Sequence, residues 1–325
     1  MWKKISAVVL PTIIAVLIFW LILSRVWDDL LVVAEHIVLT WILFAAVLYA
    51  VFWFVRGFRY KEILKRLGTE VGVVFSTACI YLSQTANIIL PARLGDLTRM
   101  LILKQEKQTP FTNSLTSLIA ERAYDILAIA LLGLCTLPFI ISLIPKEYEW
   151  FIWLIVLVPV CGAVGVLFLF AVRRLHAQNK VVAKILEIFA QFHAVSASLS
   201  SFGLLSATSV VIWVGDILVC WVVALMFGIE IHFILVVLAV VIGNLIKAVP
   251  ITPGGIGTYE LTLVVVFQIG GVPAATATLI AIIDHLIKNG VTLLGGIISL
   301  YGFGGWAVSL LKRVAQEDRA SLEKE

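Results

Sequence analysis

The chain has 325 residues, 62% of them hydrophobic and 14% charged, with a mean hydropathy of +1.09 and a formal net charge of +4. Soluble domains carry about 45–50% apolar and about 25% charged residues, so this composition excludes a water-soluble domain. It predicts an all-α integral membrane protein, because helices satisfy their own backbone polar groups in lipid. Cys79, Cys135, Cys161 and Cys220 lie far apart in apolar runs and are expected to be buried free thiols.

Eight apolar blocks are candidates to cross or enter the bilayer, a crossing taking about 20 residues of helix. They cover roughly 5–24, 37–55, 71–90, 113–144, 151–172, 204–228, 233–251 and 274–303. The first block is too long for a signal peptide and has no cleavage site before Arg25, so we expect it to be retained. The stretch 173–203 is expected to be a cytoplasmic amphipathic connector, and 312–325 a cytoplasmic tail after a transmembrane domain at 1–311.

Two of these blocks end in breaks instead of ordinary loops. The third runs into Leu90-Pro91-Ala92-Arg93-Leu94-Gly95-Asp96, followed by a short apolar leg at 97–103. The seventh runs through Pro250 into Pro253-Gly254-Gly255-Ile256-Gly257, followed by Glu260 and a leg at 261–270. Legs of about ten residues rise only ~15 Å as helix, half a bilayer. We therefore predict two re-entrant hairpins, 71–103 and 233–270, beside about six full spans.

The distribution of basic residues tests this topology. With the N-terminus inside and both hairpins re-entrant, 17 of the 24 Lys and Arg are cytoplasmic, Arg56 and Arg59 among them, and only Arg25 and Lys146 are outside. Basic residues concentrate on the cytoplasmic side of membrane proteins. The first hairpin then enters from the cytoplasm and the second from outside, as in inverted repeats. Both termini are predicted to be cytoplasmic, in the cell membrane.

The two halves of the chain share an order of features. The first repeat, about 71–144, has Asn87, Pro91, Gly95 and Asp96, then Glu121-Arg122-x-x-Asp125. The second, about 204–303, has Asn244, Pro253, Gly257 and Glu260, then Asp284-His285-x-x-Lys288. The shared order predicts an inverted repeat, with Asn87, Pro91, Asn244, Pro250 and Pro253 shaping the broken backbone.

The chemistry of the two hairpins predicts an anion site. Each return leg begins at a tip, and helix N-termini and glycine-lined turns bind anions. The candidate binding residues are Arg93, Gly95, Asp96, Arg99, Glu121, Arg122, Asp125, Lys247, Gly254, Gly255, Gly257, Glu260, Asp284, His285 and Lys288. Arginine suits phosphate because it can bind bidentately. The acids are expected to pair with the bases, since an isolated charge at mid-bilayer costs about 3 kcal/mol or more.

Two residues keep alternative roles. His285 is either a satisfied core group or a proton-sensitive site residue, and Asp216 either pairs structurally or contacts substrate. The sequence has no Walker loop, zinc-binding His-Glu-x-x-His pattern, cysteine cluster or Gly-x-Ser-x-Gly elbow. We therefore expect no metal, no cofactor and no enzymatic activity.

Pro91-x-Arg93-x-Gly95-Asp96-x-x-Arg99 and Pro253-Gly254-Gly255-Ile256-Gly257-x-x-Glu260 resemble the paired signatures of the lysylphosphatidylglycerol synthase transmembrane (flippase-like) family. Glu121-Arg122-x-x-Asp125 fits the pattern that follows the first signature, and the resemblance covers about residues 5–305. Asp96 stands where the family has Glu, and His285 where Arg is common. The expectation is a stand-alone member without the soluble synthase domain, and hence without aminoacyl transfer.

This resemblance implies movement of lipids between leaflets. The expected partners are membrane lipids: a phospholipid, an aminoacylated phosphatidylglycerol, or a polyprenyl-phosphate-linked lipid. No nucleic acid is expected as a partner. Assembly into a homo-oligomer is left as an open alternative. The predicted function is a lipid translocase that moves an anionic or phosphate-containing headgroup through a charged site at mid-membrane. The alternatives are a membrane-embedded transferase acting on a lipid-linked substrate and an ion-coupled small-molecule carrier.

Overall fold

The computed structural model describes residues 26–90, 93–140, 180–248 and 252–303, parts of 13–24, and positions 157, 161, 164 and 165. Within these residues every regular element is a helix, which confirms the all-α class. Most of block 5–24, nearly all of block 151–172, the tail 312–325, Pro91 and Pro250 lie outside the described residues.

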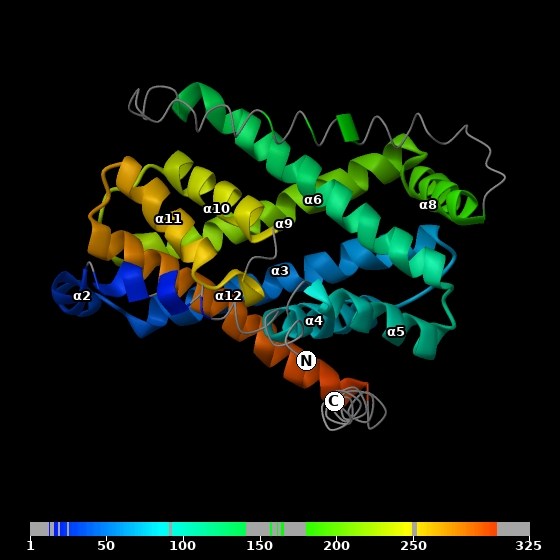
Figure 1. Cartoon of the computed structure of the whole chain (residues 1–325), viewed down its shortest axis with the longest axis horizontal. Coiled ribbons are helices and arrows are strands. Elements are labelled where there is room, and N and C mark those ends of the chain that lie inside the picture. Colours follow the sequence, from blue (N-terminus) through cyan, green and yellow to red (C-terminus); the bar gives the residue numbers. More distant parts are fainter. Residues whose placement is uncertain are drawn as a thin grey trace.

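Four long helices form the frame: α3 (Leu39–Arg66), α6 (Phe111–Ile140), α9 (Leu199–Met226) and α12 (Ala274–Gly302). Among the described helices, α3, α9 and α12 have the length and apolar composition to cross a membrane, while α4 (Val73–Ile89) and α10 (Phe233–Ala248) are shorter apolar helices. The frame runs along the length of the molecule, with α2 (Trp27–Ala34) at one end and α8 (Lys180–Ser196) at the other (Figure 1). The chain is a multi-pass membrane protein.

The outer surface agrees with a lipid environment. Large apolar side chains on α3 and α12 point outward: Val47, Val51, Phe54, Leu294 and Ile298. Among the predicted buried thiols, Cys79 and Cys220 are buried, whereas Cys135 and Cys161 are exposed. The prediction of burial was wrong for these two because an apolar run shows only that a residue avoids water, and its side chain can face lipid instead of protein.

The first predicted hairpin consists of α4 (Val73–Ile89) and α5 (Gly95–Lys107), packed antiparallel. Gly95 lies directly against Ser83 and Asn87 near the end of α4, and Thr69 and Thr109 meet at 3.4 Å at the open end of the hairpin. The return helix is longer than the predicted leg at 97–103. It continues through Lys104 to Lys107 because these residues are good helix formers, and it stops where Gln108 adopts a left-handed conformation.

The second predicted hairpin consists of α10 (Phe233–Ala248) and α11 (Thr258–Ile269), joined by the short 3-10 helix η3 (Pro253–Gly255). Gly270 lies against Leu235 at the open end, and Gly255 lies against Lys247 at the tip, so the two helices are antiparallel. The hairpins point toward each other from opposite halves of the molecule (Figure 1). Arg93 Nη2 donates to Lys247 O at 3.3 Å, so the two tips are in contact.

The helix lengths of the two halves match in order. Helices α3, α4, α5 and α6 have 28, 17, 13 and 30 residues, and α9, α10, α11 and α12 have 28, 16, 12 and 29. The described part of the predicted connector 173–203 contains two helices. Helix α8 lies within it as a separate helix, and α9 begins inside it at Leu199. The first long helices of the two halves, α3 and α9, pack against each other over an extensive contact.

Glycines let α12 approach α4 closely. Gly295 lies against the Tyr81 ring and Gly296 against the Thr85 side chain, and Thr85 Oγ1 donates to Thr292 O at 2.9 Å. Small residues allow helices in a membrane to pack at short distance. A side chain at Gly296 would overlap Thr85, whereas one at Gly290 on the same helix would meet no atom within 4 Å in the described part of the chain.

We expect Gly296→Val to destabilise the protein by about 1–3 kcal/mol through overpacking. The melting temperature in detergent should fall by roughly 5 °C. Gly290→Val is the matched control, because it makes the same change of helix propensity without a clash. Equal melting temperatures for the two variants would contradict the close approach of α4 and α12.

Candidate functional site

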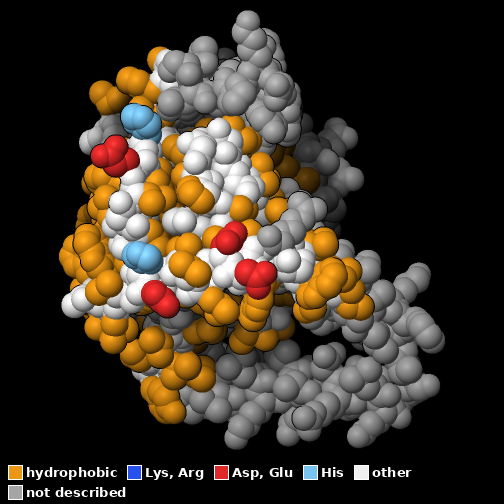
Figure 2. Space-filling view, turned by 90° about the vertical axis from the view of Figure 1, so that its left-hand side faces the viewer, with side chains coloured by type: hydrophobic (Ala, Val, Ile, Leu, Met, Phe, Trp, Pro, Cys, Tyr) orange, Lys and Arg blue, Asp and Glu red, His pale blue; other side chains and the backbone are white. Residues whose placement is uncertain are grey.

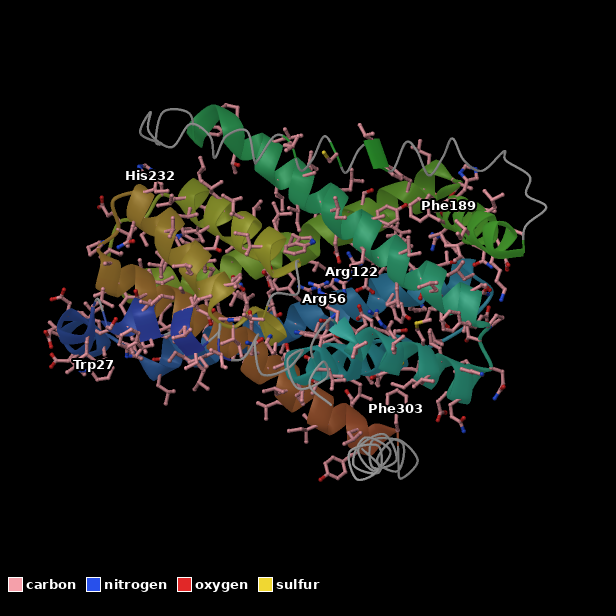
Figure 3. The ribbon with its side chains drawn as sticks, in the orientation of Figure 1. Trp27, Arg56, Arg122, Phe189, His232 and Phe303 are labelled. Carbon is pink, nitrogen blue, oxygen red and sulfur yellow. The ribbon has the colours of Figure 1, made fainter. Side chains whose placement is uncertain are left out.

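A cavity of about 390 Å³ lies where the two hairpin tips meet the four long helices. It is lined by Tyr49, Trp53, Arg56, Ile80, Gln84, Asn87, Ile88, Leu90, Arg93, Glu121, Arg122, Asp125, Ile126, Ile129, Trp213, Asp216, Asn244, Leu245, Lys247, Thr252, Pro253, Gly254, Gly255, Tyr259, Lys288, Asn289 and Thr292. Figure 3 shows Arg56 and Arg122 midway along the molecule, where the cavity lies. Its volume is within the range of small-molecule sites, about 300–1,000 Å³.

The first tip holds Arg93 in a strained backbone. Its φ is +56°, in the left-handed region, which costs a residue other than glycine roughly 1–2 kcal/mol. The guanidinium reaches across to the second hairpin and donates to Lys247 O at 3.3 Å. Such strain persists where the surrounding structure enforces it, often at functional sites.

The second tip is stabilised by its own return helix. Gly257 precedes α11 with φ +84°, which glycine adopts at low cost, and its N–H donates to Glu260 Oε2 at 2.7 Å. The other oxygen, Oε1, lies 2.7 Å from His285 Nδ1, and His285 Nε2 lies 3.0 Å from Lys247 Nζ. With Glu260 ionised, Nδ1 carries the hydrogen and Nε2 accepts from the Lys247 ammonium. A chain of hydrogen bonds thus joins the Gly257 backbone to Lys247.

An arginine network joins α3, α5 and α6 beside the cavity. Arg99 Nη1 donates to Glu121 Oε2 at 2.6 Å, and Arg59 Nη1 donates to Asp125 Oδ1 at 2.6 Å. Arg99 and Arg59 are 0% and 1% exposed. Arg122 contacts the network more loosely, with Nη2 at 3.5 Å from Asp96 and Nη1 at 3.8 Å from Asp125. Arg122 therefore lines the cavity, and its ion pairs are longer than those of Arg99 and Arg59.

Asp96, at the start of α5, is tied to α4 as well. Its Oδ1 accepts hydrogen bonds from Ser83 Oγ and Asn87 Nδ2, both at 3.0 Å. These bonds explain why the return helix begins directly beside the last turns of α4. Asn87, which was predicted to shape the broken backbone, makes one of these two contacts.

A lysine network joins α9, α11 and α12 on the other side. Lys288 Nζ lies 2.9 Å from Asp284 Oδ2 and 3.3 Å from Asp216 Oδ2. Tyr259 Oη donates to Asp284 Oδ2 at 2.8 Å. Asn244 Nδ2 donates to Asp216 at 3.1 Å, which ties α10 to α9. Asp216 therefore pairs structurally and also lines the cavity, which is compatible with both of its predicted roles.

The charges in and around the cavity do not cancel fully. The cations are Arg56, Arg59, Arg93, Arg99, Arg122, Lys247 and Lys288, and the acids are Asp96, Glu121, Asp125, Asp216, Glu260 and Asp284. Within the described part of the chain, Arg93 and Lys247 are the members of this set with no carboxylate oxygen within 4.0 Å. Both line the cavity at the hairpin tips.

The predicted binding residues divide into two groups. Those that line the cavity are Arg93, Glu121, Arg122, Asp125, Lys247, Gly254, Gly255 and Lys288. Those that lie behind its wall are Gly95, Asp96, Arg99, Gly257, Glu260, Asp284 and His285. Asn87, Asn244 and Pro253 line the cavity too, while Pro91 and Pro250 lie outside the described residues.

Two arginines of the site were assigned wrongly from the sequence. Arg56 and Arg59 were counted with a cytoplasmic loop, but α3 continues through both to Arg66. Arg56 Nη2 lies 3.8 Å from Asp216, and Arg59 donates to Asp125 and to Ser209. A signal was present: Tyr49, Trp53 and Arg56 recur at helical spacing, and all three line the cavity.

Arg59→Met tests the arginine network. Removing one partner of a buried ion pair costs about 3–5 kcal/mol, because the other charge stays buried without its partner. We expect a loss of about that size in the free energy of unfolding, measured in mixed detergent micelles. The double variant Arg59→Met/Asp125→Asn should lose less than the sum of its two single variants.

Arg66→Met on the same helix is the matched control. Arg66 pairs with Glu62 at 3.0 Å, but the guanidinium is partly exposed and the pair is expected to contribute under about 1 kcal/mol. If Arg59→Met and Arg66→Met lower the free energy of unfolding by similar amounts, burial does not set the strength of the network.

Known proteins resemble this chain over most of its length. A glycosyltransferase named AglD from Haloferax volcanii is 32% identical over 79% of the chain, which corresponds to 48% of that protein. A UPF0104 membrane protein from Methanocaldococcus jannaschii is 25% identical over 66% of the chain and 92% of its own length. Another, from Pyrococcus horikoshii, is 22% identical over 92% of the chain and 97% of its own length.

The glycosyltransferase corrects one expectation. The sequence predicted that the chain is not an enzyme, and that prediction is contradicted by a relative whose name points to an enzyme. The chain spans about half the length of that relative.

No solved structure matches the chain. The family described as "Lysylphosphatidylglycerol synthase TM region" matches residues 7–296, nearly the whole length of the sequence. The resemblance found in the two hairpin signatures is thereby confirmed, and the chain belongs to the lysylphosphatidylglycerol synthase TM region family.

Proposed function

We propose that the chain binds a phosphate-bearing lipid headgroup between the two hairpin tips and moves it between the leaflets of the cell membrane. The observation that carries this proposal is the pair Arg93 and Lys247, two cavity cations without a carboxylate partner in the described part. An anion within reach of both would neutralise them, and the guanidinium could bind phosphate bidentately. The lipid tails would stay in the bilayer.

The fold supports a site at mid-membrane. We place the two hairpins as re-entrant elements from opposite faces, within inverted repeats that begin at α3 and α9, with about six full spans in all. The matching helix lengths of the two halves and the contact between the tips support this placement. An irregular backbone at that depth needs protein or a wet cavity around it, which the tips have.

The charge distribution supports a cytoplasmic position for the end of the molecule opposite α2. Figure 2 looks at the end of the molecule that carries α2, and no Lys or Arg side chain is visible among the described residues there. The turns 227–232 and 270–273 likewise contain neither residue. At the opposite end, α3 finishes with Lys65 and Arg66, and α5 with Lys104 and Lys107. By the positive-inside rule the basic end is cytoplasmic.

A transferase that acts on a lipid-linked substrate is the second candidate. The relative named glycosyltransferase AglD favours it. Such an enzyme needs a site for the same kind of headgroup, so the cavity would serve both activities. Purified protein incubated with a polyprenyl phosphate and nucleotide-sugar donors would reveal a glycosylated lipid product if transfer occurs.

Arg93→Ala/Lys247→Ala tests the headgroup site. Hydrogen bonds to charged groups contribute about 1.5–3 kcal/mol each, and 1.4 kcal/mol is a tenfold change. We therefore expect at least about a tenfold loss in binding of undecaprenyl phosphate. Exchange of a fluorescent analogue between leaflets of proteoliposomes should fall in parallel.

The control is Lys104→Ala/Lys107→Ala, which also removes two cations but from the exposed end of the first hairpin. This variant should exchange lipid like the parent protein. If both double variants behave alike, net charge and not the tip site governs the activity.

Cysteine labelling tests the orientation. In a background with Cys135 and Cys161 replaced by Ser, Lys107→Cys should react with an impermeant maleimide only from the cytoplasmic side. Glu230→Cys should react only from the outside, since both side chains are exposed at opposite ends of the molecule. Labelling of both positions from one side would reject the opposed entry of the hairpins.

A further inference from the structure

Part of the cavity wall is polar but uncharged, and the ion-pair networks do not use it. Four side chains there make no hydrogen bond in the described part of the chain: Tyr49, Trp53, Gln84 and Asn289. They come from α3, α4 and α12, and we call them the neutral subsite. The Trp53 Nε1–H is buried without an acceptor, and buried polar groups are normally hydrogen-bonded. The other three side chains line the cavity with their polar groups available to a ligand.

Trp53 is the most constrained member of the neutral subsite. It is 2% exposed, stacks on Tyr81 with ring centroids 3.9 Å apart, and meets Tyr49 edge-on at 6.1 Å. Its Nε1–H is buried without an acceptor. Because packing holds the ring in place, the donor cannot turn to another acceptor, and Trp53 borders the cavity from which an oxygen could approach it.

The acids of the cavity, by contrast, are already paired. Glu121 binds Arg99, Asp125 binds Arg59, and Asp216 binds Lys288. An ammonium group in the ligand would find no free carboxylate among the described residues that line the cavity and would have to displace one of these bases. A headgroup that carries a positive charge is therefore disfavoured. A neutral hydroxyl-bearing group, by contrast, fits the unpaired amides, indole and phenol.

Resting on the proposed function, we infer that the substrate is a phosphate-linked lipid whose phosphate carries a neutral, hydroxyl-rich group such as a sugar. Arg93 and Lys247 take the phosphate, and the neutral subsite takes the hydroxyls. Amides can donate and accept at once, which suits hydroxyls that do the same. The site thereby discriminates against an aminoacylated phospholipid, whose headgroup carries an ammonium.

Binding of three lipids to the full chain in nanodiscs tests this specificity: hexosyl-phosphoundecaprenol, undecaprenyl phosphate and lysylphosphatidylglycerol. We expect the hexosyl lipid to bind at least tenfold more tightly than the other two. Gln84→Met/Asn289→Leu keeps side-chain size but removes the amides, and it should reduce that preference to within twofold. Trp53→Phe, which keeps the stacking ring and removes the donor, should reduce it partly.

Binding of undecaprenyl phosphate reports on folding and on the phosphate site separately. It should change less than twofold in Gln105→Met, an exposed control on α5, and should fall less in Gln84→Met/Asn289→Leu than binding of the hexosyl lipid does. Equal binding of all three lipids by the parent protein, or tightest binding of lysylphosphatidylglycerol, would overturn the inference while leaving the phosphate site intact. Undiminished undecaprenyl phosphate binding by Arg93→Ala/Lys247→Ala would overturn the proposed function itself.

Discussion

Arg59 and Asp125 meet at 2.6 Å between α3 and α6, where the two residues are 1% and 6% exposed. A charge buried there without a partner is costly, so each ion pair fixes the relative position of the helices that supply it. Arg99 and Glu121 do the same for α5 and α6, and Lys288 and Asp216 for α12 and α9. These pairings set the distances between the long helices, and the cavity is the space that remains between them.

The same constraint explains where the ligand site lies. Once the internal pairs have formed, the charge left over sits on the two tips, where the backbone is irregular and cannot be straightened into helix. Arg93 is held in a left-handed conformation and reaches the opposite hairpin, while Lys247 is held by His285. The tip contact brings these cations together although they are 154 positions apart in the chain.

Much of this arrangement could be predicted from local pattern. The proline and glycine breaks predicted where both helical hairpins turn, whereas the inverted repeat, based on the shared order of Asn, Gly and acid, stays a prediction. Arg56 and Arg59 were misplaced because a helix that leaves the apolar run can continue with buried charges, and hydropathy alone cannot show which side of it faces protein. Tyr49, Trp53, Gln84 and Asn289 carry no motif, and only the packing of α3, α4 and α12 brings them into one wall.

The two networks differ in the chemistry of their bases. The cations of the α3, α5 and α6 network and of the first tip are all arginines, which stay protonated at any physiological pH. Those of the second tip and of α12 are Lys247 and Lys288, with His285 lying between Lys247 and Glu260. One network is therefore built on guanidinium groups, which can bind two oxygens at once in a fixed plane, and the other on ammonium groups, which act as compact point charges. An anion between the tips would accordingly meet a directional donor from the first hairpin and a freely rotating one from the second.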